Sequence, residues 1–229
     1  IADPNNKGVL IAATNAGIYR TTNHGNTWTR IITGNFKEIT FNPINSNVVY
    51  AATYGTAKYY RSTNNGVNFT QVTTGLPTGK RRMVIGVTAH DSNFVYVLVT
   101  NSRTYQGIYL STDKGATFTQ MSNKPNIMDY STTGSGTGGQ AWYDLDIAVD
   151  PLDKTAIYVG GVNIFKSTDS GKTWKINAHW VGSGGAPPIH ADQHVMEYDH
   201  TNKRLYIGND GGVYYTADGG KKYTDISEG

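Results

Sequence analysis

The segment Ser167-Thr-Asp-Ser-Gly-Lys-Thr-Trp174 is one of five copies of a pattern that decides the fold of this 229-residue chain. Every copy reads Ser/Thr-x-Asp/Asn-x-Gly-x-x-aromatic, and the five glycines are separated by 41, 49, 56 and 49 residues. A period of about 40 to 50 residues is typical of the blades of a β-propeller. The sequence therefore predicts a repeat protein with one blade for each copy.

The chemistry of this repeated box is that of a tight turn. An Asp or Asn side chain accepts hydrogen bonds from backbone N–H groups within the turn, and the glycine adopts a left-handed conformation that a Cβ atom would penalise. We therefore expect a structural role, and not a catalytic or metal-binding one, for the paired box residues Asn23 and Gly25, Asn64 and Gly66, Asp113 and Gly115, Asp169 and Gly171, and Asp218 and Gly220.

A second turn precedes each box by about 20 residues, a spacing that fits two short strands. It reads Asp3-Pro-Asn-Asn in the first repeat and Asp150-Pro-Leu-Asp in the fourth, and an apolar run such as Ala156-Ile-Tyr-Val159 follows it. Each repeat then contains four antiparallel strands, which is the blade of a propeller. We predict an all-β propeller segment over residues 1–229, with blades at about 1–35 (partial), 36–76, 83–122, 141–178 and 190–229, and with further blades in a ring of seven or more or in a tandem ring.

Composition supports this fold and argues against several functions. The chain has 27 glycines, 16 tyrosines and no cysteine, which suits short strands and tight turns without disulfides. Its net charge of +3 is scattered, with Lys80-Arg81-Arg82 as the one basic run, so we expect no nucleic-acid partner. No stretch approaches the roughly 20 apolar residues that span a membrane. The start at Ile1 is expected to be processed or truncated.

The repeated boxes resemble those of the Asp-box (bacterial neuraminidase repeat) superfamily, which includes sialidases, xyloglucanase-like glycoside hydrolases, sortilin-type receptors and a photosystem assembly factor. Two longer stretches are similar to large secreted proteins of the Bacteroidetes type: Ala141-Trp-Tyr-Asp-Leu-Asp-Ile-Ala-Val-Asp-Pro151, and His190-Ala-Asp-Gln-His194 with Gly208-Asn-Asp-Gly-Gly-Val-Tyr214. The resemblance implies a secreted or cell-surface bacterial protein. It specifies the fold more strongly than the activity.

Two departures from the superfamily bear on activity. Sialidases need an arginine triad and an Arg-Ile-Pro-like motif, and no arginine of this chain lies in such a motif, so sialidase activity is not expected. Xyloglucanase-like enzymes use two aspartates from separate propellers. Asp146 or Asp150 aligns loosely with one of them through the Trp…Leu-x-Ile-x-x-Asp-Pro pattern, but no second propeller is present in this sequence.

Long loops between blades bring aromatic side chains to one face. The insertions at 73–82, 122–140 and 178–189 are expected to bring the ligand-binding candidates Tyr130, Trp142, Tyr143 and Trp180 towards this face. Aromatic rings over an open groove are surfaces on which sugar rings stack. In the alternative interpretation, the tryptophans only pack beneath the glycine-rich loops.

Charged side chains form a second group of candidates. If a strand begins near Ala191, then His190, Asp192 and His194 alternate onto one side and could hold a divalent metal or form a hydrogen-bonded plug. Three side chains on one extended strand span roughly 13 Å, so without a bend they cannot all reach one ion. We therefore expect no cofactor, with a divalent metal as the less favoured alternative, and we count His190 and His194 as ligand-binding candidates.

Carboxyl groups of the chain could also catalyse the hydrolysis of a glycoside. Asp144, Asp146 and Asp192 are the catalytic candidates, because glycoside hydrolysis needs one protonated and one ionised carboxyl group about 5 to 10 Å apart. Asp210, in a predicted Asn209-Asp-Gly-Gly212 turn, is a ligand-binding candidate. In the alternative interpretation, these groups only bind backbone and water. The sequence thus predicts a polysaccharide or surface-protein ligand and allows a glycoside hydrolase. The other function it leaves open is a non-enzymatic adhesin, receptor or assembly scaffold.

Overall fold

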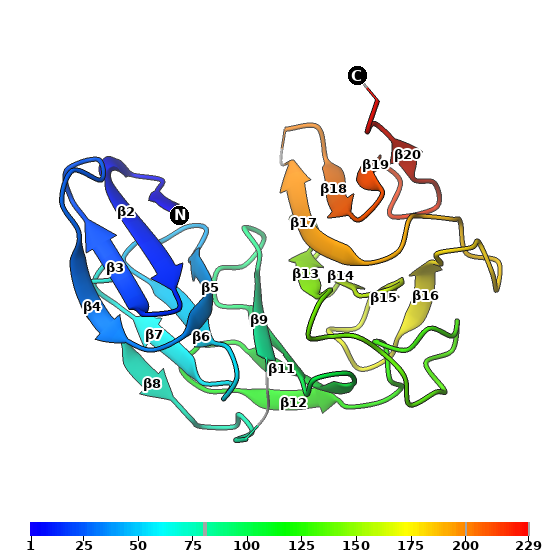
Figure 1. Cartoon of the computed structure of the whole chain (residues 1–229), viewed down its shortest axis with the longest axis horizontal. Coiled ribbons are helices and arrows are strands. Elements are labelled where there is room, and N and C mark those ends of the chain that lie inside the picture. The colour runs from blue at the N-terminus through cyan, green and yellow to red at the C-terminus, as the bar shows by residue number, and fades with distance from the viewer. Residues whose placement is uncertain (80–81, 200, 229) are drawn as a thin grey trace. The chain divides into compact units, whose positions relative to one another are not determined.

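The computed structural model describes residues 1–79, 82–199 and 201–228, and over these residues the protein consists of strands and connecting loops without a helix. The strands form five four-stranded antiparallel sheets, each built from consecutive strands (Figure 1). The predicted all-β fold with propeller blades is confirmed. Among the described residues, none forms a helix that could cross a membrane. Of the Lys80-Arg81-Arg82 run, the first two residues lie outside the described part of the chain.

The five sheets are numbered here as blades in chain order. Blade 1 contains β1 (Ala2–Asp3), β2 (Asn6–Thr14), β3 (Gly17–Thr21) and β4 (Thr29–Thr33). Blade 2 contains β5 (Phe36–Phe41), β6 (Val49–Thr53), β7 (Tyr59–Ser62) and β8 (Thr70–Val72). Blade 3 contains β9 (Arg82–Val87), β10 (Val95–Thr100), β11 (Tyr105–Ser111) and β12 (Thr119–Ser122). Blade 4 contains β13 (Asp146–Val149), β14 (Ile157–Gly160), β15 (Ile164–Ser167) and β16 (Lys175–Ala178). Blade 5 contains β17 (Gln193–Asp199), β18 (Arg204–Asn209), β19 (Gly212–Thr216) and β20 (Thr224–Asp225).

The chain divides into two compact units. The first unit comprises Ile1–Val99 and Tyr109–Gln120, and the second comprises Thr100–Ile108 and Met121–Gly229. The second unit therefore holds blades 4 and 5 together with one end of blade 3, strand ends and loops included. All the candidate ligand-binding and catalytic residues lie in this second unit.

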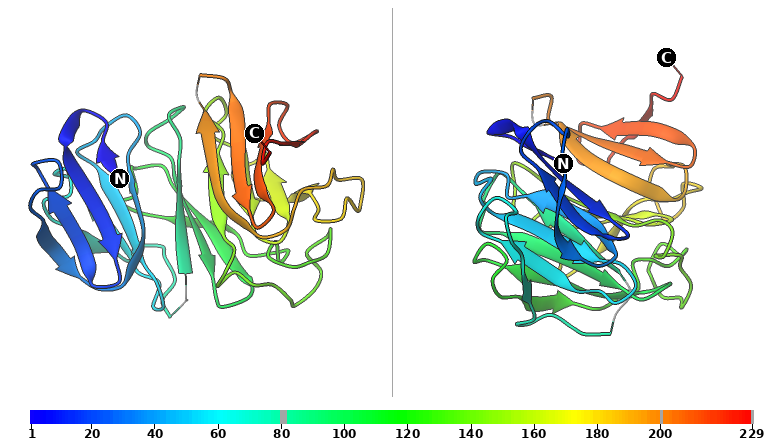
Figure 2. Two further views of the ribbon diagram at one scale, coloured as in Figure 1. Left: turned by 45° about the horizontal axis from the view of Figure 1, so that its top comes forward. Right: turned by 60° about the vertical axis from the view of Figure 1, so that its left-hand side comes forward.

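The second strands of blades 2 to 4 are fully buried. Every residue of β6, β10 and β14 is buried, so both faces of these strands are covered, which suits their Val, Ile, Leu, Ala and Tyr side chains. In the second unit, Tyr158, Ile164, Met196 and Ile207 belong to one buried cluster that joins blades 4 and 5. Figure 2 shows the neighbouring strands β17, β18 and β19 of blade 5.

The Asp-box makes the hydrogen bonds of a turn. In blade 4, the Ser167 hydroxyl donates to Asp169 at 2.7 Å and accepts the N–H of Gly171 at 2.8 Å. Asp169 also accepts the N–H and the hydroxyl of Thr173 at 2.9 and 2.7 Å. Because Thr173 is held in the turn, the last strand of this blade begins only at Lys175.

A cation just before the box links a blade to the next one. This side chain occupies the position before the box Ser or Thr, and it donates to a backbone carbonyl in the box turn of the following blade. The bonds within each unit are Arg20 to Asn65 at 2.9 Å and Arg61 to Lys114 at 2.8 Å in the first, and Lys166 to Gly219 at 3.2 Å in the second. These bonds therefore connect blade 1 to blade 2, blade 2 to blade 3, and blade 4 to blade 5.

Candidate functional site

The candidate site begins at the tight turn that leads into blade 4. The N–H of Tyr143 donates to the carbonyl of Gln140 at 2.7 Å, and the N–H of Trp142 donates to the carbonyl of Ser102 at 3.0 Å. These bonds fix the backbone and leave the Trp142 side chain 50% exposed. The Trp142 and Tyr143 rings lie 5.5 Å apart between centroids, so they form one aromatic surface.

The loop before this turn is organised around a buried carboxylate. Asp129 accepts hydrogen bonds from the Ser131 hydroxyl at 2.6 Å and from the N–H of Gly136 at 2.9 Å. Burial opposes the ionisation of Asp129, but these hydrogen bonds outweigh it and lower its pKa. A Cβ atom at Gly136 would lie 2.5 Å from the Asp129 carboxylate, so the close approach requires glycine. The sequence analysis missed Asp129, although the glycine-rich run 134–139 marks the tight loop that needs it.

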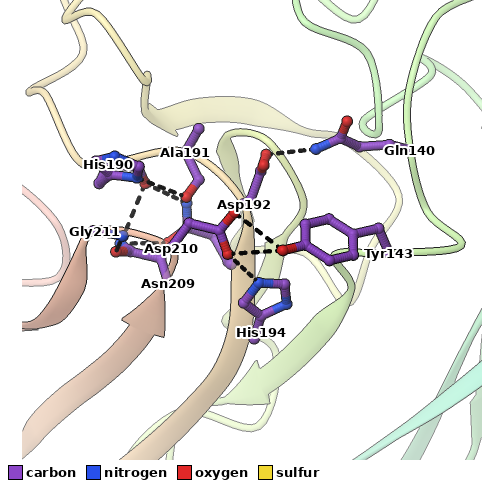
Figure 3. A network of polar contacts seen from close by, with 10 residues as sticks. Gln140, Tyr143, His190, Ala191, Asp192, His194, Asn209, Asp210 and Gly211 are labelled. Carbon is purple, nitrogen blue, oxygen red and sulfur yellow. Dashed lines mark hydrogen bonds and ion pairs between the residues drawn. The ribbon is translucent and has the colours of Figure 1, made fainter.

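Tyr143 reaches blade 5 and meets Asp210 there (Figure 3). The Tyr143 hydroxyl lies 3.1 Å from both carboxylate oxygens of Asp210, and Nε2 of His194 lies 2.6 Å from one of them. The Tyr143 and His194 rings are nearly perpendicular, with centroids 4.8 Å apart. We call these three residues the Asp210 cluster. The sequence had indicated each of them as a separate candidate.

The turn between β18 and β19 presents Asp210. Asn209 pairs with Gly212, so Asp210 and Gly211 form a two-residue hairpin loop, as the sequence predicted. The hydrogen bond from His194, followed by that from Tyr143, lowers the pKa of Asp210. The hydrogen bond between Tyr143 and Asp210 also raises the pKa of Tyr143. The cluster therefore exposes an ionised carboxylate beside a neutral phenol.

A second carboxyl group of the site is buried. Asp144 is 1% exposed, and burial, with a smaller contribution from the charge of Asp192, raises its pKa to about 8. Burial, followed by the charge of Asp210, also raises the pKa of Asp192. The Gln140 amide donates to Asp192 at 2.6 Å. Asp144 therefore holds a proton at neutral pH next to a more exposed carboxyl group.

Asp146, the third catalytic candidate, binds backbone. It is the first residue of β13, whereas Asp144 lies in the turn before that strand, so the two do not share a strand face. One oxygen of Asp146 accepts the N–H of Ile147 at 2.9 Å, and the other accepts the N–H of Met196 at 2.6 Å. The bond from Met196 connects the first strands of blades 4 and 5.

The expected alternation of His190, Asp192 and His194 along one strand is wrong. The strand β17 begins at Gln193, and Asp192 has a φ angle of 66°, so the chain turns where the pattern assumed an extended backbone. Asp192 consequently meets Gln140, while His194 meets Asp210. Within the described part of the chain, no three His, Asp or Glu side chains are grouped in a way that could hold a metal ion.

Trp180 and Tyr130 are positioned by the buried Asn163 and not by the residues of the Asp210 cluster. The buried Asn163 side chain accepts the N–H of Trp180 at 3.1 Å and donates to the carbonyl of Tyr130 at 3.1 Å. His179 is also buried, and its Nε2 lies 3.3 Å from the same carbonyl. Asn163 and His179 escaped the sequence analysis because single polar residues next to a strand carry no periodic signal.

Comparison with known proteins places this fold among xyloglucanases and related propellers. A curated relative from Neosartorya fischeri, named "Probable oligoxyloglucan-reducing end-specific xyloglucanase", is 31% identical over 122 residues, which are 52% of this chain and 14% of the relative. A GH74 xyloglucanase structure from Xanthomonas campestris has a TM-score of 0.74 at 17% identity, and an ancestral GH74 enzyme has a TM-score of 0.72 at 16% identity. Each alignment covers 99% of this chain, but only 37% and 30% of the two structures.

One family model covers more than half of the chain. It is the Sortilin-Vps10 model, described as "Sortilin, neurotensin receptor 3", and it matches residues 16–150. That stretch includes the boxes of blades 1 to 3 and the turn that carries Trp142 and Tyr143. The chain therefore belongs to the Sortilin-Vps10 family of β-propeller proteins.

Proposed function

We propose that this chain is a glycan-binding propeller segment of a xyloglucanase-like protein that is secreted by a bacterium or displayed on its surface. The observation that carries the proposal is the exposed aromatic surface of Trp142 and Tyr143 beside the ionised Asp210. The relatives that contain this fold are longer than the chain, so we also propose that further blades accompany it.

The chemistry of the Asp210 cluster suits a neutral, hydroxyl-rich ligand. The apolar face of a sugar ring stacks on an indole or a phenol, and its hydroxyl groups donate to a carboxylate and exchange hydrogen bonds with an imidazole. Trp142 supplies the stacking surface, and Asp210 supplies an acceptor that His194 and Tyr143 hold in place. The partial identity to a xyloglucanase favours a β-linked glucan backbone as the ligand class.

The environment of the three candidate catalytic carboxyl groups favours binding over hydrolysis at this face. Asp144 holds a proton, as a general acid must, but at 1% exposure its carboxyl group cannot contact a glycosidic oxygen. Asp146 is occupied by backbone N–H groups. Asp146 and Asp192 are both partly exposed, but the carboxylate oxygens of Asp146 already accept backbone N–H groups, whereas hydrolysis needs two carboxyl groups that reach the ligand.

Titration with xyloglucan oligosaccharides tests the proposal. We expect Trp142→Ala to weaken binding by about tenfold, because a stacked aromatic contributes roughly 0.5–1.5 kcal/mol in addition to its buried area. Trp28→Ala is the matched control, because Trp28 is 43% exposed, belongs to the first unit and should leave binding unchanged. Absence of binding by the unmodified protein, or equal affinity of the two variants, would refute the proposal.

A protein ligand is the second candidate, and membership of a family whose model is described as "Sortilin, neurotensin receptor 3" favours it. A protein partner would use the same exposed face without discriminating among sugars. Binding that persists when xyloglucan oligosaccharides are added in excess, and that Trp142→Ala removes, would select this function over the first.

A further inference from the structure

A second aromatic surface of the second unit is a groove beside the Asp210 cluster, which we call the Trp180 groove. It is open to solvent and is formed by the loop that enters blade 5 and by the last two strands of that blade. Its lining residues are Trp180, Pro188, Ile189, His190, Tyr214, Tyr223 and Asp225. This lining contains no Lys or Arg, and its one carboxylate disfavours an anionic ligand.

The floor of this groove is rigid. Tyr214 pairs with Asp225 across β19 and β20, and the Tyr223 hydroxyl donates to the Asn177 side chain at 2.5 Å. Tyr214 and Tyr223 also pack against the buried cluster that contains Ile189. The two phenol rings are therefore held in place before any ligand arrives, which reduces the entropic cost of binding.

The wall of the groove is a positioned tryptophan. Trp180 is 49% exposed, and its backbone N–H is held by Asn163, which is itself 1% exposed. The buried Asn163 amide also donates to the carbonyls of Asp129 and Tyr130. The loop that carries Trp180 is thus attached to the Asp129 loop, and its indole is presented to solvent on a fixed backbone.

His190 connects the groove to the Asp210 cluster. A Cβ atom on Gly211 would lie 2.3 Å from the His190 ring, so His190 packs directly on the turn that holds Asp210. The His190 carbonyl accepts hydrogen bonds from Gln193 at 2.7 Å and from Asn209 at 3.2 Å. Figure 3 shows His190 and Tyr143 on opposite sides of Asp210.

From this continuity we infer that the Trp180 groove is a second sugar-binding subsite, and that the ligand is an oligosaccharide that occupies the groove and the Asp210 cluster together. Trp180 and the two tyrosines supply stacking surfaces, and Asp225 supplies an acceptor for sugar hydroxyls. The Ser227 hydroxyl and N–H hold Asp225 at 2.5 and 2.9 Å. The inference rests on the proposed function and adds to it a requirement for ligand length.

A series of β-1,4-linked gluco-oligosaccharides, from cellobiose to cellohexaose, tests this requirement by calorimetric titration. In the unmodified protein we expect affinity to rise with chain length. Trp180→Ala should weaken binding of cellohexaose by about fivefold to tenfold and leave cellobiose unchanged, since only the longer chain reaches the groove. Trp180→Phe, which keeps an aromatic ring, should retain most of the increase in affinity from cellobiose to cellohexaose.

The results separate the two claims. Equal losses for cellobiose and cellohexaose in Trp180→Ala, or no loss for either, would overturn the subsite while Trp142→Ala still tests the proposed function. Affinity that does not rise with length in the unmodified protein would also overturn it. If no oligosaccharide binds at all, both claims fail. A circular dichroism spectrum matching that of the unmodified protein excludes misfolding of the variants.

Discussion

The hydroxyl of Tyr143 lies 3.1 Å from both carboxylate oxygens of Asp210, a residue 67 positions later in the chain. Tyr143 belongs to the turn before blade 4, and Asp210 belongs to the hairpin loop between β18 and β19 of blade 5. The contact therefore depends on the correct packing of the two blades. It converts two exposed loop residues into one positioned pair.

Replacing Tyr143 by Phe tests the electrostatic part of this pair. The ring and its contact with His194 remain, but the hydrogen bond to Asp210 is lost. Because that bond helps to lower the pKa of Asp210, its pKa should rise toward the ordinary value. Glycan binding should weaken about threefold to tenfold, as for loss of one ordinary hydrogen bond. The pKa is followed by NMR titration of the carboxyl carbon. An unchanged pKa would show that His194 alone sets the charge of Asp210.

The box glycine of blade 4 should matter to folding and not to binding. Gly171 has a φ angle of 84°, and a Cβ atom there would lie 2.6 Å from Ile108. Gly171→Val should lower the free energy of unfolding by more than the ~1–3 kcal/mol of backbone strain alone. Gly185→Val is the matched control, because Gly185 has a φ of 78° and open space around it. Equal denaturation midpoints for the two variants would contradict the packing argument.

Asp144 should make stability depend on pH in an unusual direction. Its folded-state pKa of about 8 lies above the ordinary value of 3.8, so between these values the unfolded chain releases a proton that the folded protein keeps. Stability is therefore greatest at low pH with respect to this group. It falls as pH rises through this window, by at most about 1.4 kcal/mol per pH unit, and is constant above the folded-state pKa.

The comparison of Asp144→Asn with the unmodified protein isolates this effect. The variant should lose the fall in stability between pH 4 and 8, as measured by chemical denaturation, because the amide does not titrate. Asp113→Asn is a control of opposite sign, because hydrogen bonds that outweigh burial lower the pKa of Asp113 to about 2. The stability that ionised Asp113 contributes is therefore lost only as the pH falls into the acid range. An identical slope in Asp144→Asn and the unmodified protein would show that another group carries the dependence.

The blades could be predicted from the sequence because their signals are local. Asp169 and Gly171 recur at a fixed spacing, and the turn they form needs only residues within the same box. The Asp210 turn was predicted for the same reason. By contrast, the left-handed backbone at Asp192 breaks the alternation on which the His190, Asp192 and His194 hypothesis rested. No glycine marks the turn at Asp192, so the sequence pattern gives no sign of it.

The site could be predicted only as separate residues. Tyr143, His194 and Asp210 were each candidates, but their contacts join segments that pair through blade packing, which sequence spacing does not encode. Tyr223, the aromatic residue of the last box, also lines the Trp180 groove, which the box pattern does not indicate. Buried polar residues such as Asn163, which position loops through backbone contacts, resemble ordinary loop residues in the sequence.

The most direct test of a glycan on the aromatic face is an NMR titration of the four tryptophan indole signals with a xyloglucan oligosaccharide. The account predicts that the Trp142 and Trp180 signals shift, while the exposed Trp28 and the buried Trp174, whose Nε1 donates to Ser122 at 3.0 Å, do not. Shifts confined to Trp28, or no shift of Trp142 at saturating oligosaccharide, would contradict it.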